Sequence, residues 1–109
     1  MPKILVCGND DTRESLKSIL GDLYNLILTE DQGQCLDVLY HAKDISHLLI
    51  DYLVGDEFPQ KIKKEYPALR IVLILDRKST LKPKEILALG AHKPLSKPLL
   101  TDKVIASLK

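Results

Sequence analysis

A carboxylate and a lysine stand at the ends of two apolar runs of the sequence. The run Leu48-Leu49-Ile50 closes on Asp51, and Lys97-Pro98 follows a weaker run at 92–96. An apolar run that ends on a lone acid predicts a buried strand that delivers the carboxylate to the rim of a parallel sheet. Lysine followed by proline places an ammonium on a neighbouring rim and forces a rigid turn. Such a pair forms either a reactive site or a structural ion pair, and the residue types leave both interpretations open.

Alternating strand-like and helix-like segments must position this pair. Short apolar runs predict strands at 4–7, 26–28, 48–50, 71–75 and 92–96. Apolar residues at helical spacing lie between and after them, and Ser79 or Thr80 is the expected cap of the fourth helix, which Gly90 ends. Five strand–helix alternations with short connections are typical of a doubly wound parallel α/β sheet, in which ligands gather at the carboxyl ends of the strands.

The bulk composition indicates one small globular domain, 1–109. The chain has 109 residues, 45% of them hydrophobic, and a net charge of +1. This charge predicts no contact of the domain with nucleic acid, and no apolar stretch is long enough to cross a membrane. Two isolated cysteines, Cys7 and Cys35, predict buried, reduced thiols and a cytoplasmic protein. No glycine-rich phosphate loop or nucleophile elbow is present, so we expect a protein that is not an enzyme.

The ordered motifs resemble the receiver domain of two-component response regulators over essentially the whole chain. The interval from Gly33 to Asp51, and Gly90-Ala91 followed by Lys97-Pro98, have the spacing of that family. The resemblance implies a single flavodoxin-like sheet with strand order 2-1-3-4-5. It also implies Asp51 as the phosphoacceptor, Lys97 as the ion-pair partner of the phosphate, and a cis bond before Pro98.

The resemblance further implies a magnesium site, since magnesium disperses charge on a transferring phosphoryl group. Candidate ligands are the carboxylates of Asp51 and Asp10 and the backbone carbonyl of Leu53. We expect magnesium to bind weakly, because the adjacent acidic pair of the family is incomplete.

Two registers are open for that acidic pair. Counting from the first strand places it at Gly8 and Asn9, whereas counting back from the first helix places it at Cys7 and Gly8. Neither register restores two carboxylates. Asp10 and its neighbour Asp11 are then expected mainly to cap the first helix and favour its dipole.

The positions of the family's conformational switch are also altered. A hydroxyl is expected at the end of the fourth strand, where this chain has Leu75 followed by Asp76. An aromatic residue is expected on the fifth strand, where this chain has Pro94. A proline ring fixes the backbone and offers no comparable change of rotamer. The resemblance is therefore to an atypical receiver with a degenerate acidic pocket.

The function expected from this resemblance is signal transduction in a two-component phosphorelay. A sensor histidine kinase or phosphotransfer protein would supply the phosphoryl group to Asp51. An output domain, a partner protein or a second copy of the chain would dock on the face around Ile86, Leu87, Pro94 and Val104. The alternative is a pseudo-receiver that acts only as a phosphorylation-independent interaction or dimerisation module.

Overall fold

A five-stranded parallel sheet forms the centre of the molecule, as predicted. The computed structural model describes residues 3–52, 57–76 and 81–109. The strand order is β2-β1-β3-β4-β5, so the predicted fold class and strand order are confirmed. The strands are β1 (Lys3–Cys7), β2 (Asn25–Thr29), β3 (Ile45–Asp51), β4 (Arg70–Leu75) and β5 (Lys93–Ser96).

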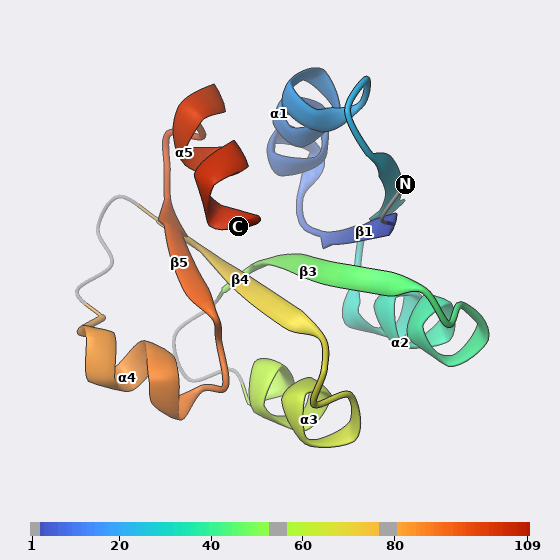
Figure 1. The fold of residues 1–109 in the computed structure, drawn as a ribbon, viewed down its shortest axis with the longest axis vertical. Helices are drawn as coiled ribbons and strands as arrows, with labels where there is room; N and C mark the ends of the chain where they lie inside the picture. The colour runs from blue at the N-terminus through green and yellow to red at the C-terminus, as the bar shows by residue number, and fades with distance from the viewer. Residues whose placement is uncertain (1–2, 53–56, 77–80) are drawn as a thin grey trace.

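Helices cover both faces of the sheet. Figure 1 shows α1 and α5 above the sheet and α2, α3 and α4 below it. None of the helices in the described ranges is long and apolar enough to cross a membrane. The helices are α1 (Asp10–Leu20), α2 (Gln32–His41), α3 (Phe58–Glu65), α4 (Pro83–Ala88) and α5 (Thr101–Ser107).

The central strands are buried on both faces because each face carries a layer of helices. In β3, Leu48 and Ile50 pack into the core between the sheet and helices α2 and α3. Leu49 packs into the core on the opposite face, between the sheet and helices α1 and α5. This alternation follows from the two-residue repeat of a strand. It explains why β3 and β4 have unbroken apolar runs in the sequence.

Local signals in the sequence set several helix boundaries. The Asn9 side chain caps α1 by accepting a hydrogen bond from the Thr12 amide at 2.9 Å. Gly90 follows α4 with φ of 78°, a conformation that glycine adopts without strain. The predicted caps Ser79 and Thr80 lie outside the described residues, and α4 itself begins at Pro83.

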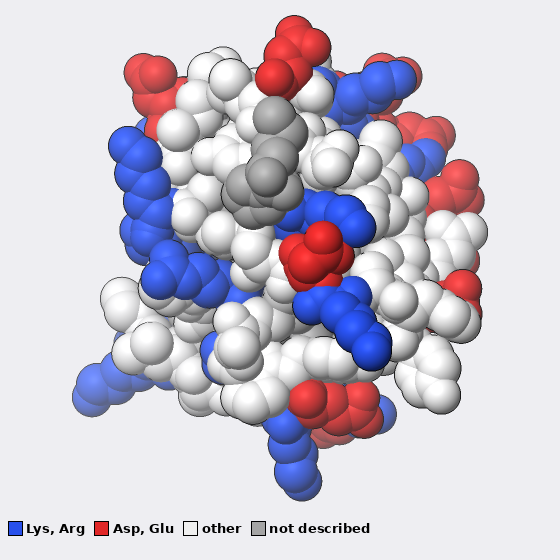
Figure 2. Space-filling model, turned by 45° about the vertical axis from the view of Figure 1, so that its right-hand side comes forward, with Lys and Arg blue, Asp and Glu red and all other residues white. Residues whose placement is uncertain are grey.

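Charged side chains of both signs share the surface. Figure 2 shows basic and acidic side chains interspersed on the same face, some in contact with each other and others with uncharged residues between them. Some opposite charges are paired in the structure, and the Lys3 ammonium lies 3.0 Å from the Asp44 carboxylate. This face therefore presents no extended field of a single sign.

Basic side chains from three neighbouring strands hold the end of the chain. His47 Nε2 lies 2.8 Å from the Leu108 carbonyl oxygen. Arg70 Nη1 donates to the Lys109 carbonyl at 2.9 Å, and Lys93 Nζ lies 3.4 Å from the Ala106 carbonyl. The last carbonyls of a helix have no partner within the helix, so these contacts stabilise α5 on the sheet.

The buried imidazole of His47 makes this end of the structure sensitive to pH. Burial lowers the pKa of His47 below its usual 6.5, and the nearby charge of Arg70 acts in the same direction. The unfolded chain then binds the proton more readily than the folded chain. Stability is therefore fully present above about pH 6.5 and declines as the pH falls below that value.

We expect urea unfolding to show this decline between pH 7.5 and 5.5, and a smaller decline in His47→Gln. The glutamine amide can still donate to Leu108 but does not titrate. His41→Gln is the control, because the His41 side chain is exposed at the end of α2, away from the carbonyls that His47, Arg70 and Lys93 contact. An equal pH dependence in the wild type and His47→Gln would contradict this prediction.

Candidate functional site

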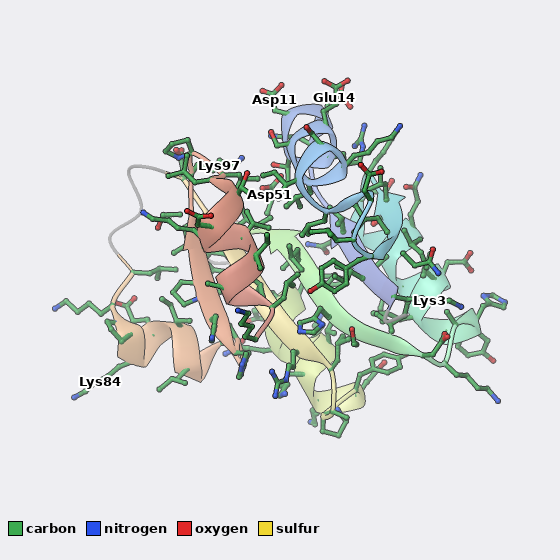
Figure 3. The ribbon with its side chains drawn as sticks, turned by 45° about the horizontal axis from the view of Figure 1, so that its top comes forward. Lys3, Asp11, Glu14, Asp51, Lys84 and Lys97 are labelled. Atoms are coloured by element: carbon green, nitrogen blue, oxygen red, sulfur yellow. The ribbon has the colours of Figure 1, made fainter. Side chains whose placement is uncertain are left out.

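The structure brings Asp51 and Lys97 together at the carboxyl edge of the sheet. Lys97 Nζ lies 3.4 Å from Asp51 Oδ1, and their side chains are 31% and 21% exposed. Asp51 ends β3, while Lys97 follows β5 and its amide donates to the Leu75 carbonyl at 2.9 Å. Figure 3 shows the two side chains close to each other, with Asp11 and Glu14 further out on α1. The Lys97–Pro98 bond is cis, as the resemblance implied.

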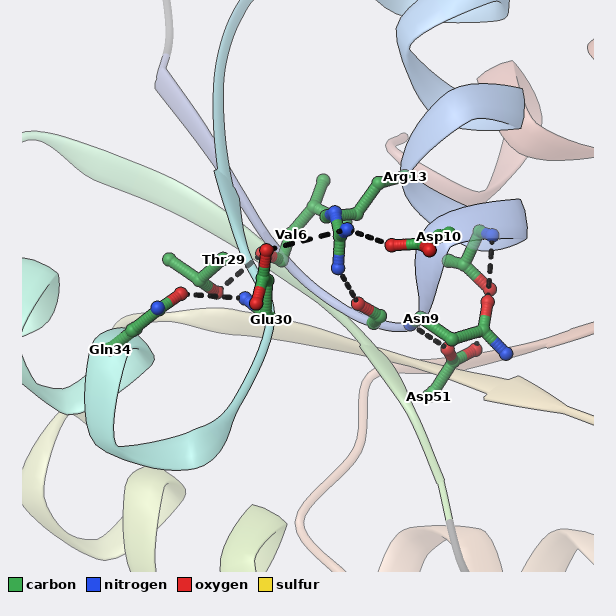
Figure 4. A network of polar contacts seen from close by, with 10 residues as sticks. Val6, Asn9, Asp10, Arg13, Thr29, Glu30, Gln34 and Asp51 are labelled. Carbon is green, nitrogen blue, oxygen red and sulfur yellow. Dashed lines mark hydrogen bonds and ion pairs between the residues drawn. The ribbon is translucent and has the colours of Figure 1, made fainter.

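Asp51 is also bound by Thr12, which the sequence did not indicate, and by Asn9, which one register placed in the acidic pair. The Thr12 hydroxyl donates to Oδ1 at 2.9 Å, and the Asn9 amide donates to Oδ2 at 2.9 Å. Figure 4 shows Asn9, directly before α1, beside Asp51 at the end of β3. A signal for Thr12 does exist, because Thr12, Leu16 and Leu20 share the buried stripe of α1. Each oxygen of Asp51 therefore has a donor from α1 or from the turn before it.

A glycine allows this close approach. Gly8 is buried, and a Cβ atom at this position would lie 2.7 Å from Asp51 Oδ2 and 2.8 Å from Thr12 Cγ2. Both distances are shorter than non-bonded atoms tolerate. Since β1 ends at Cys7 and α1 begins at Asp10, Gly8 and Asn9 fill the turn. The register counted from the first strand is therefore the one the structure has.

Asp10, a predicted magnesium ligand, forms an ion pair with Arg13. The Asp10 side chain is 89% exposed, and its carboxylate binds the Arg13 guanidinium. The same guanidinium lies 3.6 Å from the Glu30 carboxylate. Leu53, whose carbonyl was the third predicted ligand, lies outside the described residues. The predicted pairing of Asp10 with Asp51 at one metal ion stays a prediction.

The described residues around Asp51 do not fit a magnesium ion. Magnesium requires several oxygen ligands in near-octahedral geometry. Here Asp51 faces a hydroxyl, an amide and an ammonium, all of which act as donors toward it. In the described ranges, no group of three acidic, histidine or cysteine side chains could hold a metal ion.

The two cysteines lie in the core under the same edge. Cys7 and Cys35 are free and buried, as predicted. A hydrogen bond between the thiols lowers the pKa of Cys7, against the opposing effect of burial. The pKa of Cys35 is raised, first by the same hydrogen bond and then by burial. Cys7 is the last residue of β1, so the thiol pair connects this strand to α2.

The two switch positions have the environments expected of inert residues. Leu75 is 6% exposed and packs in the core on the side of α3 and α4. Pro94 is exposed on β5, which is an edge strand. Asp76 is exposed directly after Leu75. Neither Leu75 nor Pro94 has a hydroxyl that could donate a hydrogen bond to a phosphate on Asp51.

The predicted docking face must be corrected. Ile86 is 7% exposed and Val104 is fully buried, so neither side chain can contact a partner. Both point into the core because residues on a helix rotate by about 100° per position, and only one side of α4 or α5 can face solvent. Leu87 is 70% exposed and Pro94 is also exposed. These two remain available as surface residues.

Solved structures of receiver domains have the same fold. The receiver domain of an HD domain-containing protein from Pseudomonas fluorescens superposes with a TM-score of 0.84 at 20% identity, over 98% of this chain and 90% of that one. A response regulator receiver domain protein from Clostridium thermocellum superposes with a TM-score of 0.81 at 21% identity, over 99% of this chain and 91% of that one. A response regulator from Thermotoga maritima superposes with a TM-score of 0.78 at 18% identity, over 99% of this chain and 98% of that one.

Sequence comparison adds nothing to this result, since neither a family model nor a curated protein matches the chain. The structural likeness spans nearly the whole chain and confirms the fold that the motifs predicted. The molecule therefore has the receiver-domain fold of two-component response regulators. The fold alone does not define what this chain does, because proteins with one fold can have different functions.

Proposed function

We propose that this chain is an atypical receiver domain of a cytoplasmic signalling system that docks partners without phosphorylation. The observation that carries the proposal is the set of three donors around the Asp51 carboxylate. Thr12 and Asn9 bind its two oxygens at 2.9 Å, and Lys97 lies 3.4 Å from one of them. A carboxylate held by three donors joins α1, β3 and the segment after β5. Asp51 then acts as a structural centre, and the domain is a binding module and not an enzyme.

The docking surface is formed by the exposed side of α4, β5 and α5. Its apolar members include Leu87 and Pro94, and Lys84 and Lys103 are exposed beside them. An output domain or another partner protein is the expected occupant.

A second copy of the chain can be tested first. Amide signals of α4 and β5 would shift with protein concentration, and Leu87→Glu would abolish the shift. Leu36→Glu on α2 is the matched control, since Leu36 is 42% exposed on a different helix.

Phosphorylation of Asp51 by a histidine kinase or a phosphotransfer protein is the second candidate. It is favoured by the partial exposure of the Asp51 side chain and by the nearby ammonium of Lys97. Three features oppose a working switch: the donors bound to Asp51, the lack of a fitting magnesium site among the described residues, and the missing hydroxyl at Leu75. A ligand that interacts equally with two states shifts no equilibrium between them.

We expect beryllofluoride with magnesium chloride to leave the amide signals of α4, β5 and α5 unmoved. Any change should be confined to the surroundings of Asp51 and Lys97, because Leu75 at the end of β4 has no hydroxyl that could donate a hydrogen bond to a phosphate on Asp51. Intact mass after incubation with acetyl phosphate should show no phosphoryl adduct. A stable adduct together with large shifts around Leu87 would instead establish a phosphorylation switch.

A further inference from the structure

One guanidinium ties together the loops at the carboxyl edge of the sheet. Arg13 Nη1 donates to the Gly8 carbonyl at 2.8 Å, and Nη2 binds the Asp10 carboxylate. Nη2 also lies 3.6 Å from Glu30 Oε1, in the turn after β2. The Arg13 side chain is only 17% exposed. Figure 4 shows the guanidinium between the turn after β1 and the turn after β2.

The oxygens around Arg13 are those that a divalent cation prefers. Two carboxylates and a backbone carbonyl are typical ligands of magnesium and manganese. In this chain they surround a fixed positive charge with planar donors, which bind carboxylates well. The cation that these three oxygens bind is therefore a side chain of the protein itself, the Arg13 guanidinium.

A single peptide group connects Arg13 to Asp51. The Gly8 carbonyl accepts from Arg13, and the Asn9 amide of the same peptide bond donates to Asp51 Oδ2. In a trans peptide the carbonyl and the amide point in opposite directions, so fixing one fixes the other. A donor on the carbonyl also polarises the amide and strengthens its hydrogen bond.

We propose that Arg13 is a resident cation that replaces a divalent metal ion at this edge and positions the Asn9 amide on Asp51. Because this role rests on the metal-independent function proposed above, its test must be separate from the docking test. Removal of the guanidinium leaves Asp10, Glu30 and the Gly8 carbonyl without their cation. These oxygens then become a binding site for manganese.

The test measures paramagnetic broadening of amide signals during titration with manganese chloride. We expect the wild type to show no saturable broadening near Gly8, Asp10 or Glu30, and Arg13→Met to gain it. In Arg13→Met without metal, the Asn9 amide proton should move upfield, because its hydrogen bond to Asp51 weakens. A merely structural role for Arg13 would create no manganese site.

Two further variants keep the test decisive. Arg13→Gln retains a donor for the Gly8 carbonyl and so protects the fold, but it removes the charge and should also gain manganese binding. Lys17→Met, in the last turn of α1, is the control and should remain without it. Saturable binding at these residues in the wild type would overturn the proposal. So would folded Arg13→Met and Arg13→Gln variants that bind manganese no better than the wild type. Either result leaves the docking test through Leu87 unaffected.

Discussion

Gly8→Asp should lower the free energy of unfolding by about 3–5 kcal/mol, although it restores an acid at a position where receivers carry one. The new Cβ would lie 2.7 Å from Asp51 Oδ2 and 2.8 Å from Thr12 Cγ2. Its carboxylate would also be placed beside that of Asp51 at a buried position. Steric overlap and like-charge repulsion therefore act together. Urea unfolding monitored by circular dichroism measures the loss.

Matched variants separate the two causes. Gly8→Ala introduces only the Cβ and should cost about 1–3 kcal/mol. Asp51→Asn in the Gly8→Asp background removes one of the two charges and should recover part of the loss. Gly33→Ala is the control, since a Cβ atom there would meet only Asp31 Oδ1, at 3.3 Å. A Gly8→Asp variant that is as stable as the wild type, or that magnesium chloride fully restores, would show that the turn can accommodate an acid.

Thr12→Val should cost about 1.5–3 kcal/mol, the usual range for a hydrogen bond to a charged group. Thr12 is 1% exposed, and its hydroxyl donates to Asp51 Oδ1. Valine has nearly the same shape but no donor, so one carboxylate oxygen loses a partner in a partly buried site. Thermal and urea unfolding at neutral pH measure the effect. Thr12→Ser retains the hydroxyl and should recover most of the loss.

A double-mutant cycle identifies the partner of Thr12. If the hydroxyl acts through Asp51, the costs of Thr12→Val and Asp51→Asn will not add. Thr101→Val is the control, because Thr101 is exposed at the start of α5. Strictly additive costs would mean that Thr12 contributes through its packing and not through Asp51.

The sequence was sufficient to predict the sheet and the Asp51–Lys97 pair. Strands and helices alternate in the apolar pattern, and the carboxyl ends of parallel strands meet at one edge. An acid at the end of β3 and a lysine after β5 must then lie near each other. The sequence also showed the changes at Leu75 and Pro94, since these depend only on residue type and position along a strand.

The environment of Asp51 was decided only by the tertiary structure. Thr12 and Asn9 reach Asp51 across 39 and 42 residues, and each contact depends on how α1 is rotated and placed against the sheet. The burial of Ile86 and Val104 has the same origin, because the rotation of short helices such as α4 and α5 is set by packing. Apolar periodicity gives the buried side of a helix approximately. A hydrogen bond needs atoms placed within a fraction of an ångström, which only the packed structure provides.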